Sequence, residues 1–292
     1  MTQIRLYFLA EEAVAKKTAI ELDRNFEEEG QTTALFEHEP EPTQWCWSVY
    51  CDDTNENASR NIISQILSDA GIEAEIRSEI LQDKDWVAET LRDLAPVRAG
   101  RFFVHGSHDS HLAAQHRFPV QIDAGLAFGT GHHGTTAGCL DLLEIVLRRS
   151  QPKSALDVGT GSGVLAIALA KAARIPVLAT DIDHVATYVA KQNARINKVA
   201  TFVKTETAAG FDHPAFGKFG KADIVFANIL ARPLERLSHP LAQHVASGGS
   251  FILSGLLPHQ KARIVSAYRR QGLLLEHAHI RENWLSLLMR KP

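Results

Sequence analysis

The alternation of apolar and polar positions divides the chain into two parts with different expected structures. Near the N-terminus the pattern predicts a βαββαβ order, which is typical of a small ferredoxin-like α+β domain. Since no cluster of catalytic residue types appears in residues 1–82, we expect this domain to carry no chemistry. Its expected strands are residues 4–9, 34–39, 45–50 and 73–80, and its expected helices are residues 11–28 and 57–70.

In the C-terminal part, strands and helices alternate from residue 121 onward. Such alternation is typical of a mostly parallel, doubly wound α/β sheet, here with seven strands, the last two forming an antiparallel pair. We therefore predict a Rossmann-like domain at residues 121–292. Its expected strands are residues 154–157, 176–181, 201–204, 222–227, 250–253, 273–280 and 284–289, and its expected helices are residues 137–149, 164–173, 184–198, 233–246 and 258–270.

Residues 83–120 are expected to form a partly structured connector between these domains. The pattern indicates a short helix at residues 86–94 and a strand at residues 101–104. The connector's histidines follow no single helix face, and no carboxylate or cysteine pattern accompanies them, so no metal site is expected. These histidines are His105, His108, His111 and His116.

A glycine-rich turn follows the first strand of the C-terminal domain. Asp157 ends the strand, and Gly159, Gly161 and Gly163 come directly after it. Glycine lets such a turn adopt positive φ and lets a ligand lie against bare backbone. A dinucleotide-binding motif would have its third glycine one place later, at Val164, so the spacing favours a ligand without a pyrophosphate.

Two carboxylates stand at the end of the next strand. Asp181 ends that strand, where an acid can accept hydrogen bonds from both hydroxyls of a ribose. Asp183 is expected to cap the helix that begins at His184. On sequence grounds the two roles are interchangeable.

A second glycine-rich segment, residues 123–136, precedes the helix expected at residues 137–149. Its backbone N–H groups and hydroxyl side chains are able to fold over a ligand, although the pattern also fits a plain surface loop. Phe128 is expected either to pack against a ligand or to anchor the loop. His132 and His133 are weaker candidates, for relaying a proton.

The composition indicates the compartment in which the protein is found. The hydrophobic content of 45% suits a globular core, and the three cysteines form no Cys-x-x-Cys pair. With no basic leader and no apolar run near ~20 residues, we expect a reduced, cytoplasmic, monomeric protein without a membrane span.

The charge is distributed unevenly along the chain. Residues 1–95 carry 8 Lys and Arg against 21 Asp and Glu, a net of −13, whereas residues 96–292 carry 23 against 13, a net of +10. An acidic N-terminal domain suits a basic protein partner and not nucleic acid, because nucleic acids are bound through Lys and Arg. The alternative is an acidic surface with no partner.

Four segments together resemble one methyltransferase family. They are residues 126–136 (LAFGTGHHGTT), 157–163 (DVGTGSG), 181–183 (DID) and 228–231 (NILA). The glycine turn is similar to the first motif of the doubly wound S-adenosylmethionine (SAM) methyltransferases. The loop at residues 126–136 resembles that of the PrmA family, the methyltransferases of ribosomal protein L11. That family usually has proline where this chain has Gly134, which puts the course of the loop in doubt.

The resemblance implies SAM as methyl donor and the lysine side-chain and N-terminal amines of ribosomal protein L11 as acceptors. It also implies that the N-terminal domain recognises the substrate. Other positions in the same motifs are further candidates for cofactor binding. Carried onto matching positions, the family's SAM contacts are Thr136, Gly159, Asp181 and Asn228, and the further candidates are Asp157, Gly161, Phe128 and Thr130.

Asn228, which follows the strand expected at residues 222–227, is the candidate catalytic residue. A sulfonium methyl is already activated, so an enzyme has chiefly to align a neutral amine with it. Desolvation lowers the pKa of a lysine amine from about 10.4 and so frees its lone pair. We expect the Asn228 side-chain carbonyl, with the backbone carbonyl of Ile229 or Leu230, to accept hydrogen bonds from this amine. The alternative is that Asn228 caps the next helix.

Other functions stay open on sequence grounds. The nearest is a SAM-dependent N-methyltransferase that acts on another protein or a small amine. Ile229 and Leu230 stand where glutamine-modifying methyltransferases have two prolines, which argues against an amide acceptor. A non-catalytic SAM-binding module is a further alternative. An NAD dehydrogenase is disfavoured by Val164 and by the absence of a hydride-transfer constellation.

Overall fold

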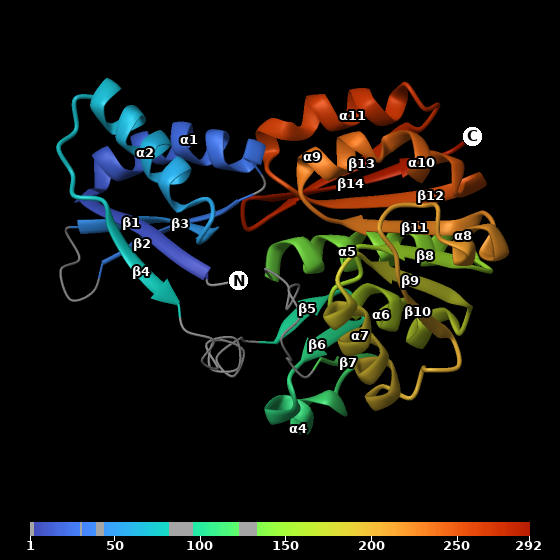
Figure 1. The fold of residues 1–292 in the computed structure, drawn as a ribbon. Helices are drawn as coiled ribbons and strands as arrows, with labels where there is room; N and C mark the ends of the chain where they lie inside the picture. The colour runs from blue at the N-terminus through green and yellow to red at the C-terminus, as the bar shows by residue number, and fades with distance from the viewer. Residues whose placement is uncertain (1–2, 30, 39–43, 82–95, 123–132) are drawn as a thin grey trace. The chain divides into compact units, whose positions relative to one another are not determined.

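The computed structural model describes residues 3–29, 31–38, 44–81, 96–122 and 133–292 (Figure 1). Contacts divide the chain into two compact units, Met1–Asp85 and Trp86–Pro292. Within the described ranges, no helix combines the length and the apolar character that crossing a membrane requires.

The N-terminal unit is a four-stranded antiparallel sheet with two helices. The strand order is β2-β3-β1-β4, and β1 pairs antiparallel with both β3 and β4. The predicted βαββαβ order is confirmed, although the last strand begins at Arg77 and not at residue 73. The elements are β1 (Gln3–Glu11), α1 (Glu12–Glu29), β2 (Thr32–Glu37), β3 (Gln44–Asp52), α2 (Glu56–Asp69) and β4 (Arg77–Leu81).

The core of this unit lies between the helices and one face of the sheet. Phe8 and Trp47 from the sheet and Phe26 from α1 are fully buried. The Phe8 and Trp47 rings stack with their centroids 5.7 Å apart. The Trp47 indole also donates a hydrogen bond to Asp23 at 3.0 Å, which satisfies its single polar group.

The described part of the predicted connector forms a small three-stranded sheet. Strand β6 pairs antiparallel with β5 and parallel with β7. Phe102 and Val120 of this sheet join the core beside α5 (His133–Arg149) and α6 (Val164–Ala173) of the larger unit. The helix expected at residues 86–94 lies outside the described residues. The elements are β5 (Val97–Ala99), β6 (Phe102–His105), η1 (Ser107–Asp109), α4 (Ser110–Ala113) and β7 (Phe118–Gln121).

The rest of the larger unit is a doubly wound sheet, as predicted. Its seven strands have the order β10-β9-β8-β11-β12-β14-β13. They are parallel from β10 to β12, whereas β14 runs antiparallel to β12 and β13. The elements are α5 (His133–Arg149), β8 (Ala155–Val158), α6 (Val164–Ala173), β9 (Val177–Asp181), α7 (His184–Ile196), β10 (Val203–Thr207), α8 (Pro214–Phe219), β11 (Ala222–Asn228), α9 (Ala231–Arg236), α10 (Ser238–Gln243), β12 (Val245–Leu256), η2 (Pro258–Gln260), α11 (Lys261–Arg269), β13 (Leu274–Arg281) and β14 (Trp284–Arg290).

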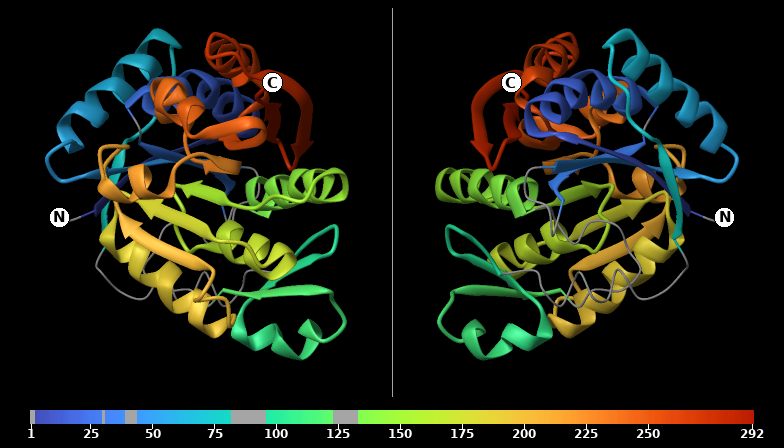
Figure 2. Two further views of the ribbon diagram at one scale, coloured as in Figure 1. Left: turned by 90° about the vertical axis from the view of Figure 1, so that its right-hand side faces the viewer. Right: turned by 90° about the vertical axis from the view of Figure 1, so that its left-hand side faces the viewer.

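Helices cover both faces of this sheet (Figure 2). Alternate residues of β11 show the two sides: Ile224 and Phe226 pack with α5, α6 and α7, whereas Val225 and Ala227 pack with α8 to α11. Because the strands are buried on both faces, they are continuous apolar runs in the sequence.

The prediction of one helix at residues 233–246 is wrong. Two short helices, α9 and α10, take its place, and β12 already begins at Val245. Pro240 gives the physical reason, because its ring would collide with the carbonyl of Arg236 in a continuous helix and it has no N–H to donate. The chain therefore turns at Leu237 and starts a new helix.

Candidate functional site

The candidate site lies at the carboxyl end of β8, where the winding of the sheet reverses. Strand β8 lies between β9 on one side and β11 on the other. The chain passes from β8 to β9 first and returns to β11 only later. Ligands of open α/β sheets bind at such a switch point, outside the carboxyl ends of the strands.

The turn after β8 requires glycine at its key positions. Gly159, Gly161 and Gly163 have φ values of 71°, 52° and 85°, which other residues rarely adopt. A Cβ on Gly159 would lie 2.3 Å from Ile229 Cγ2. The turn is also bonded to β9, since Gly159 N and Thr160 N donate to the Thr180 carbonyl at 2.8 and 2.9 Å.

Asp157 points into the protein and holds this turn against α6. Its Oδ2 accepts hydrogen bonds from Thr160 Oγ1 at 2.7 Å and from Ala166 N at 3.2 Å. The residue is 1% exposed. Burial raises the pKa of the Asp157 carboxyl to about 6, and the nearby charge of Asp181 adds to this effect. Its predicted part in cofactor binding stays a prediction.

The two acids at the end of β9 have different positions in the structure. Asp181 Oδ2 accepts from Gly161 N at 2.8 Å, so this carboxylate lies beside the glycine turn. Asp183 Oδ1 accepts from Val185 N at 2.8 Å and caps α7. The predicted cap is confirmed, and Asp181 is the acid that faces the candidate site. Its contact with a ribose stays a prediction.

Asn228 and the first turn of α5 meet beside the glycine turn. Asn228 ends β11, and its Nδ2 donates to Thr135 Oγ1 at 3.4 Å. The neighbouring Thr136 hydroxyl is buried, with the residue 2% exposed, and it finds no hydrogen-bond partner within the described ranges. A buried polar group without a partner is rare in a folded protein and points to a bound molecule.

Two exposed apolar side chains lie next to these strand ends, and neither side chain is among the predicted site groups. Ile182, after β9, is 76% exposed, and Leu230, after β11, is 50% exposed. A large apolar residue within two positions of the polar residue that ends a strand is the signal that marks them in the sequence. Each offers an apolar surface beside the candidate site.

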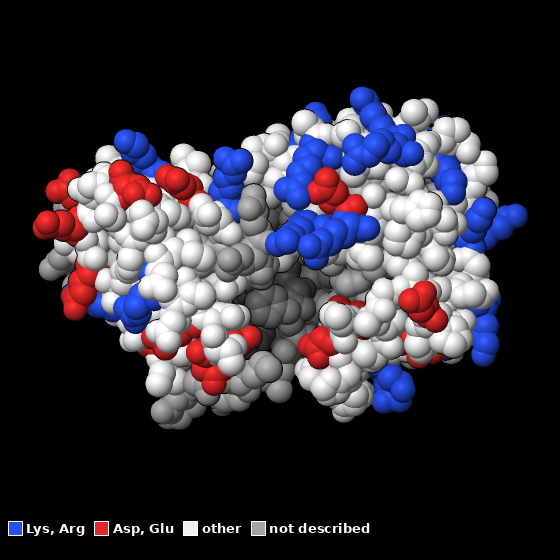
Figure 3. All heavy atoms as spheres, turned by 45° about the horizontal axis from the view of Figure 1, so that its top comes forward, with Lys and Arg blue, Asp and Glu red and all other residues white. Residues whose placement is uncertain are grey.

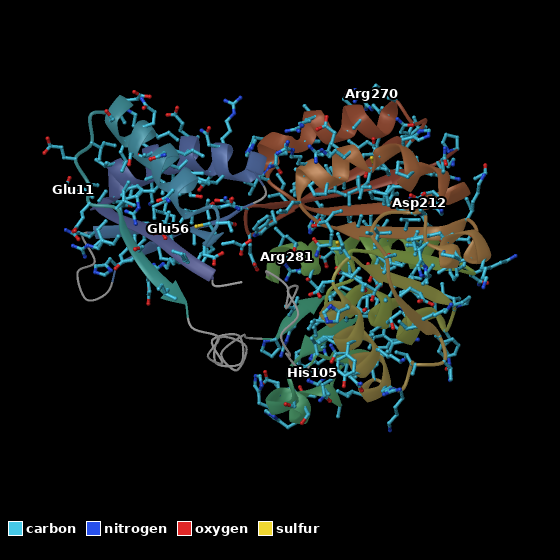
Figure 4. All side chains as sticks on the ribbon, viewed as in Figure 1. Glu11, Glu56, His105, Asp212, Arg270 and Arg281 are labelled. Carbon is cyan, nitrogen blue, oxygen red and sulfur yellow. The ribbon has the colours of Figure 1, made fainter. Side chains whose placement is uncertain are left out.

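The hairpin of β13 and β14 borders the start of α5. Arg281, labelled in Figure 4, donates to Asp141 Oδ2 at 2.9 Å, and the structure has α5 beside this hairpin. A Cβ on Gly134 would lie 2.7 Å from the Arg281 carbonyl oxygen and 2.8 Å from Trp284 Cδ1. Glycine at position 134 is therefore needed for this close approach.

Some predicted residues lie outside this geometry. Phe128, Thr130 and His132 fall outside the described residues, so their roles stay predictions, as does that of His133. In the connector, the rings of His105 and His116 stack on Phe103, with centroid distances of 5.3 and 4.0 Å.

Two further findings concern metals and cysteines. In the part of the chain that the structure describes, no group of three His, Cys, Asp or Glu residues has a metal-binding arrangement. The three cysteines are buried and free.

The strand order, with a glycine turn at its switch point that does not fit a dinucleotide, places the larger unit among the Rossmann-like methyltransferases. The chain belongs to the PrmA family, whose model, described as ribosomal protein L11 methyltransferase, matches residues 5–292. It is accordingly a protein methyltransferase.

Individual relatives agree with this assignment. The ribosomal protein L11 methyltransferase of Mesorhizobium japonicum is 47% identical over 287 residues, which cover 98% of this chain and 99% of that protein. That of a Chelativorans species is 46% identical over 291 residues, with both chains covered in full. The crystal structure of ribosomal protein L11 methylase from Lactobacillus delbrueckii subsp. bulgaricus matches with a TM-score of 0.60 and 28% identity, and covers 68% of this chain and 100% of that one.

Proposed function

We propose that this protein transfers methyl groups from SAM to lysine side-chain and N-terminal amines of ribosomal protein L11. Relatives with this name match the chain along nearly its whole length. We further propose that it acts in the cytoplasm as a monomer. Its three buried, unpaired cysteines suit a reducing compartment.

The buried Thr136 hydroxyl is the observation that carries the cofactor assignment. It has no hydrogen-bond partner among the described residues, and a ligand hydroxyl, amine or carboxylate would supply one. The other groups at this edge fit the same cofactor. Asp181 would hold the two ribose hydroxyls, and Ile182 would cover the apolar face of the adenine.

The glycine turn would bring bare backbone against the cofactor, with Gly159 and Gly161 at the point of contact. Asp157 would act through the turn, because it is almost fully buried and its Oδ2 accepts from Thr160 and Ala166. Bound in this way, SAM supplies a sulfonium methyl group. The protein's own task is then to present a nitrogen lone pair in line with that methyl carbon.

Asn228 is proposed to aim the acceptor amine. Its side-chain carbonyl, with the backbone carbonyl of Ile229 or Leu230, would accept hydrogen bonds from the neutral amine. The amine nitrogen would use its lone pair to form the new N–C bond while the S–C bond breaks. The S–C electron pair would stay on sulfur, which leaves S-adenosylhomocysteine, and the proton released from the nitrogen would pass to solvent. Exclusion of water favours the neutral amine, because it lowers the amine pKa.

The N-terminal unit is proposed to recognise the basic substrate protein. Residues 1–85 carry 7 Lys and Arg against 19 Asp and Glu, a net charge of −12. In Figure 3, acidic side chains are spread over this unit, whereas Lys and Arg side chains gather over the part of the larger unit that contains α11. Charge complementarity of this kind speeds and orients association with a basic partner.

The decisive assay mixes the full chain with SAM and purified ribosomal protein L11 and reads the product by intact mass. Mass increases in steps of one methyl group support the proposal. A second basic protein of similar size serves as the specificity control. SAM binding by calorimetry without any mass increase would favour the non-catalytic binding module instead.

A matched pair of variants tests the cofactor site. Asp181→Ala should weaken SAM binding by about 10- to 100-fold, because the charge-assisted hydrogen bonds that the carboxylate would accept from the two ribose hydroxyls are lost. Asp183→Ala removes only the cap of α7 and should leave SAM affinity near wild type. Equal loss of affinity in both variants would contradict the assignment of Asp181.

A further inference from the structure

The side-chain amide of Asn228 has two unlike ends, and the proposed reaction requires one particular end to face the substrate. A neutral amine that attacks a methyl group uses its lone pair in the reaction and offers only N–H groups to its surroundings. An amide carbonyl oxygen can accept those N–H groups, whereas an amide NH₂ cannot. The function of Asn228 therefore depends on which way its amide is turned.

Thr135 contacts the NH₂ end of that amide in the structure. Asn228 Nδ2 donates to Thr135 Oγ1 at 3.4 Å, and no hydrogen bond to Asn228 Oδ1 occurs within the residues described. Thr135 is 6% exposed, so water has little access to compete for this contact. The NH₂ end of the amide is thus held by the protein, and the carbonyl end is left to accept from a ligand.

Thr135 is itself held in place by a pair of buried serines. Ser254 Oγ donates to the Thr135 carbonyl oxygen at 3.3 Å and lies 2.8 Å from Ser286 Oγ. Ser254 is 0% exposed and Ser286 is 1% exposed. Gly138, one turn further along α5, lets the helix approach these serines, since a Cβ there would lie 2.3 Å from Ser286 Oγ.

An irregularity in β12 places Ser254 beneath Thr135. The pairing of β12 with β14 shifts register between Leu253 and Leu256, and Gly255 has a φ of 80°. Ser254 is the parallel ladder partner of Asn228. A Cβ on Gly255 would lie 2.5 Å from the Ile229 carbonyl oxygen, so this glycine admits the backbone that follows Asn228. Irregularities of this kind often re-aim side chains next to active sites.

We infer that Thr135 is a positioning residue for the methyl transfer: its hydroxyl accepts from Asn228 Nδ2 and so turns the Asn228 carbonyl oxygen toward the acceptor amine. Ser254 acts one step further away, by holding the Thr135 backbone. The inference rests on the proposed function, because it gives Asn228 a task in that reaction. It assigns to Thr135 a role in turnover and not in cofactor affinity, which separates it from Thr136.

Three variants of the full chain test this role. Thr135→Val keeps the shape of the side chain but removes the hydroxyl, and we expect kcat for methylation of ribosomal protein L11 to fall about 10- to 100-fold. The SAM dissociation constant, the KM for L11 and the far-UV circular dichroism should stay at wild-type values. Thr135→Ser, which keeps the hydroxyl, should recover kcat to within about threefold of wild type. Ser250→Ala removes a buried hydroxyl that accepts from Arg149 near the amino end of β11, away from the candidate site, and should not change kcat.

A second measurement is independent of catalysis. The side-chain amide signals of Asn228 in a ¹⁵N–¹H spectrum are assigned by their loss in Asn228→Ala, and they should shift in Thr135→Val and remain close to wild type in Thr135→Ser. An unchanged Asn228 signal in Thr135→Val overturns the inference. Wild-type kcat in Thr135→Val also overturns the inference. A loss of SAM affinity in Thr135→Val that accompanies the loss of kcat and is not reversed in Thr135→Ser overturns it as well. If the Asn228 signal shifts in Thr135→Val as expected but the wild-type protein never methylates L11, the proposed function fails while the contact between Thr135 and Asn228 stands.

Discussion

Replacing Asp157 with asparagine should change how the stability of the larger unit depends on pH. Burial raises the pKa of the Asp157 carboxyl from 3.8 to about 6. Between these values the unfolded chain has released the proton that the folded chain still holds, so stability falls as pH rises. Since each pKa unit corresponds to about 1.4 kcal/mol, ionising Asp157 costs the folded state about 3 kcal/mol.

The effect is measured as the difference in unfolding free energy between wild type and Asp157→Asn. Without SAM, urea unfolding followed by circular dichroism from about pH 4 to 8 should show wild type losing about 3 kcal/mol relative to the variant between about pH 4 and 6, with a flat difference above that window. Asp183→Asn, which changes an exposed acid two residues from Asp181, is the control. A difference that is constant from pH 4 to 6 would show that ionised Asp157 is compensated in the folded state and refute the reasoning.

Two further predictions concern packing and a buried hydroxyl. Gly138→Ala should destabilise the protein by about 1–3 kcal/mol because its Cβ would lie 2.3 Å from Ser286 Oγ, and adding Ser286→Ala should restore part of this loss in thermal unfolding. Equal stability of the single and double variants would contradict that contact. Tyr268→Phe should cost about 1–2 kcal/mol in urea unfolding, because the fully buried Tyr268 hydroxyl donates to the Leu234 carbonyl at 2.9 Å. Tyr188→Phe, at a side chain that is 62% exposed, should change little, and a similar loss in both variants would argue against the buried bond.

Local pattern predicts an element well where both of its ends carry a signal. The helix predicted at residues 164–173 is correct to the residue, because an uninterrupted run of helix-forming residues follows Gly163. In the structure Gly163 and Arg174 cap the two ends of this helix, and both lie in the left-handed region. The prediction fails at residues 233–246. The apolar spacing on both sides of Pro240 suggests one continuous helix, whereas in the structure Pro240 prevents one. Helix α8 (Pro214–Phe219) is not predicted because six residues are too few to show a period.

The sequence predicts which residues of the site stand at the end of each strand, but not which side chains from different elements contact one another. The pattern places Gly159, Asp181 and Asn228 at neighbouring ends because parallel strands finish at one edge of a sheet. It does not separate Asp181 from Asp183, since that depends on which carboxylate turns toward Gly161. The contacts of Thr135 with Asn228 and Ser254 join residues 93 and 119 positions apart, and their register is set by packing that no local pattern encodes.

The tight approach at Gly134 makes two distant stretches of the chain mutually dependent. A residue with a side chain at position 134 would push against the Arg281 carbonyl and the Trp284 ring. A relative with proline there must therefore hold its C-terminal hairpin differently. Chimeras that exchange residues 133–136 between such relatives should work only when the matching hairpin is transplanted as well, so the start of α5 and the hairpin behave as one module.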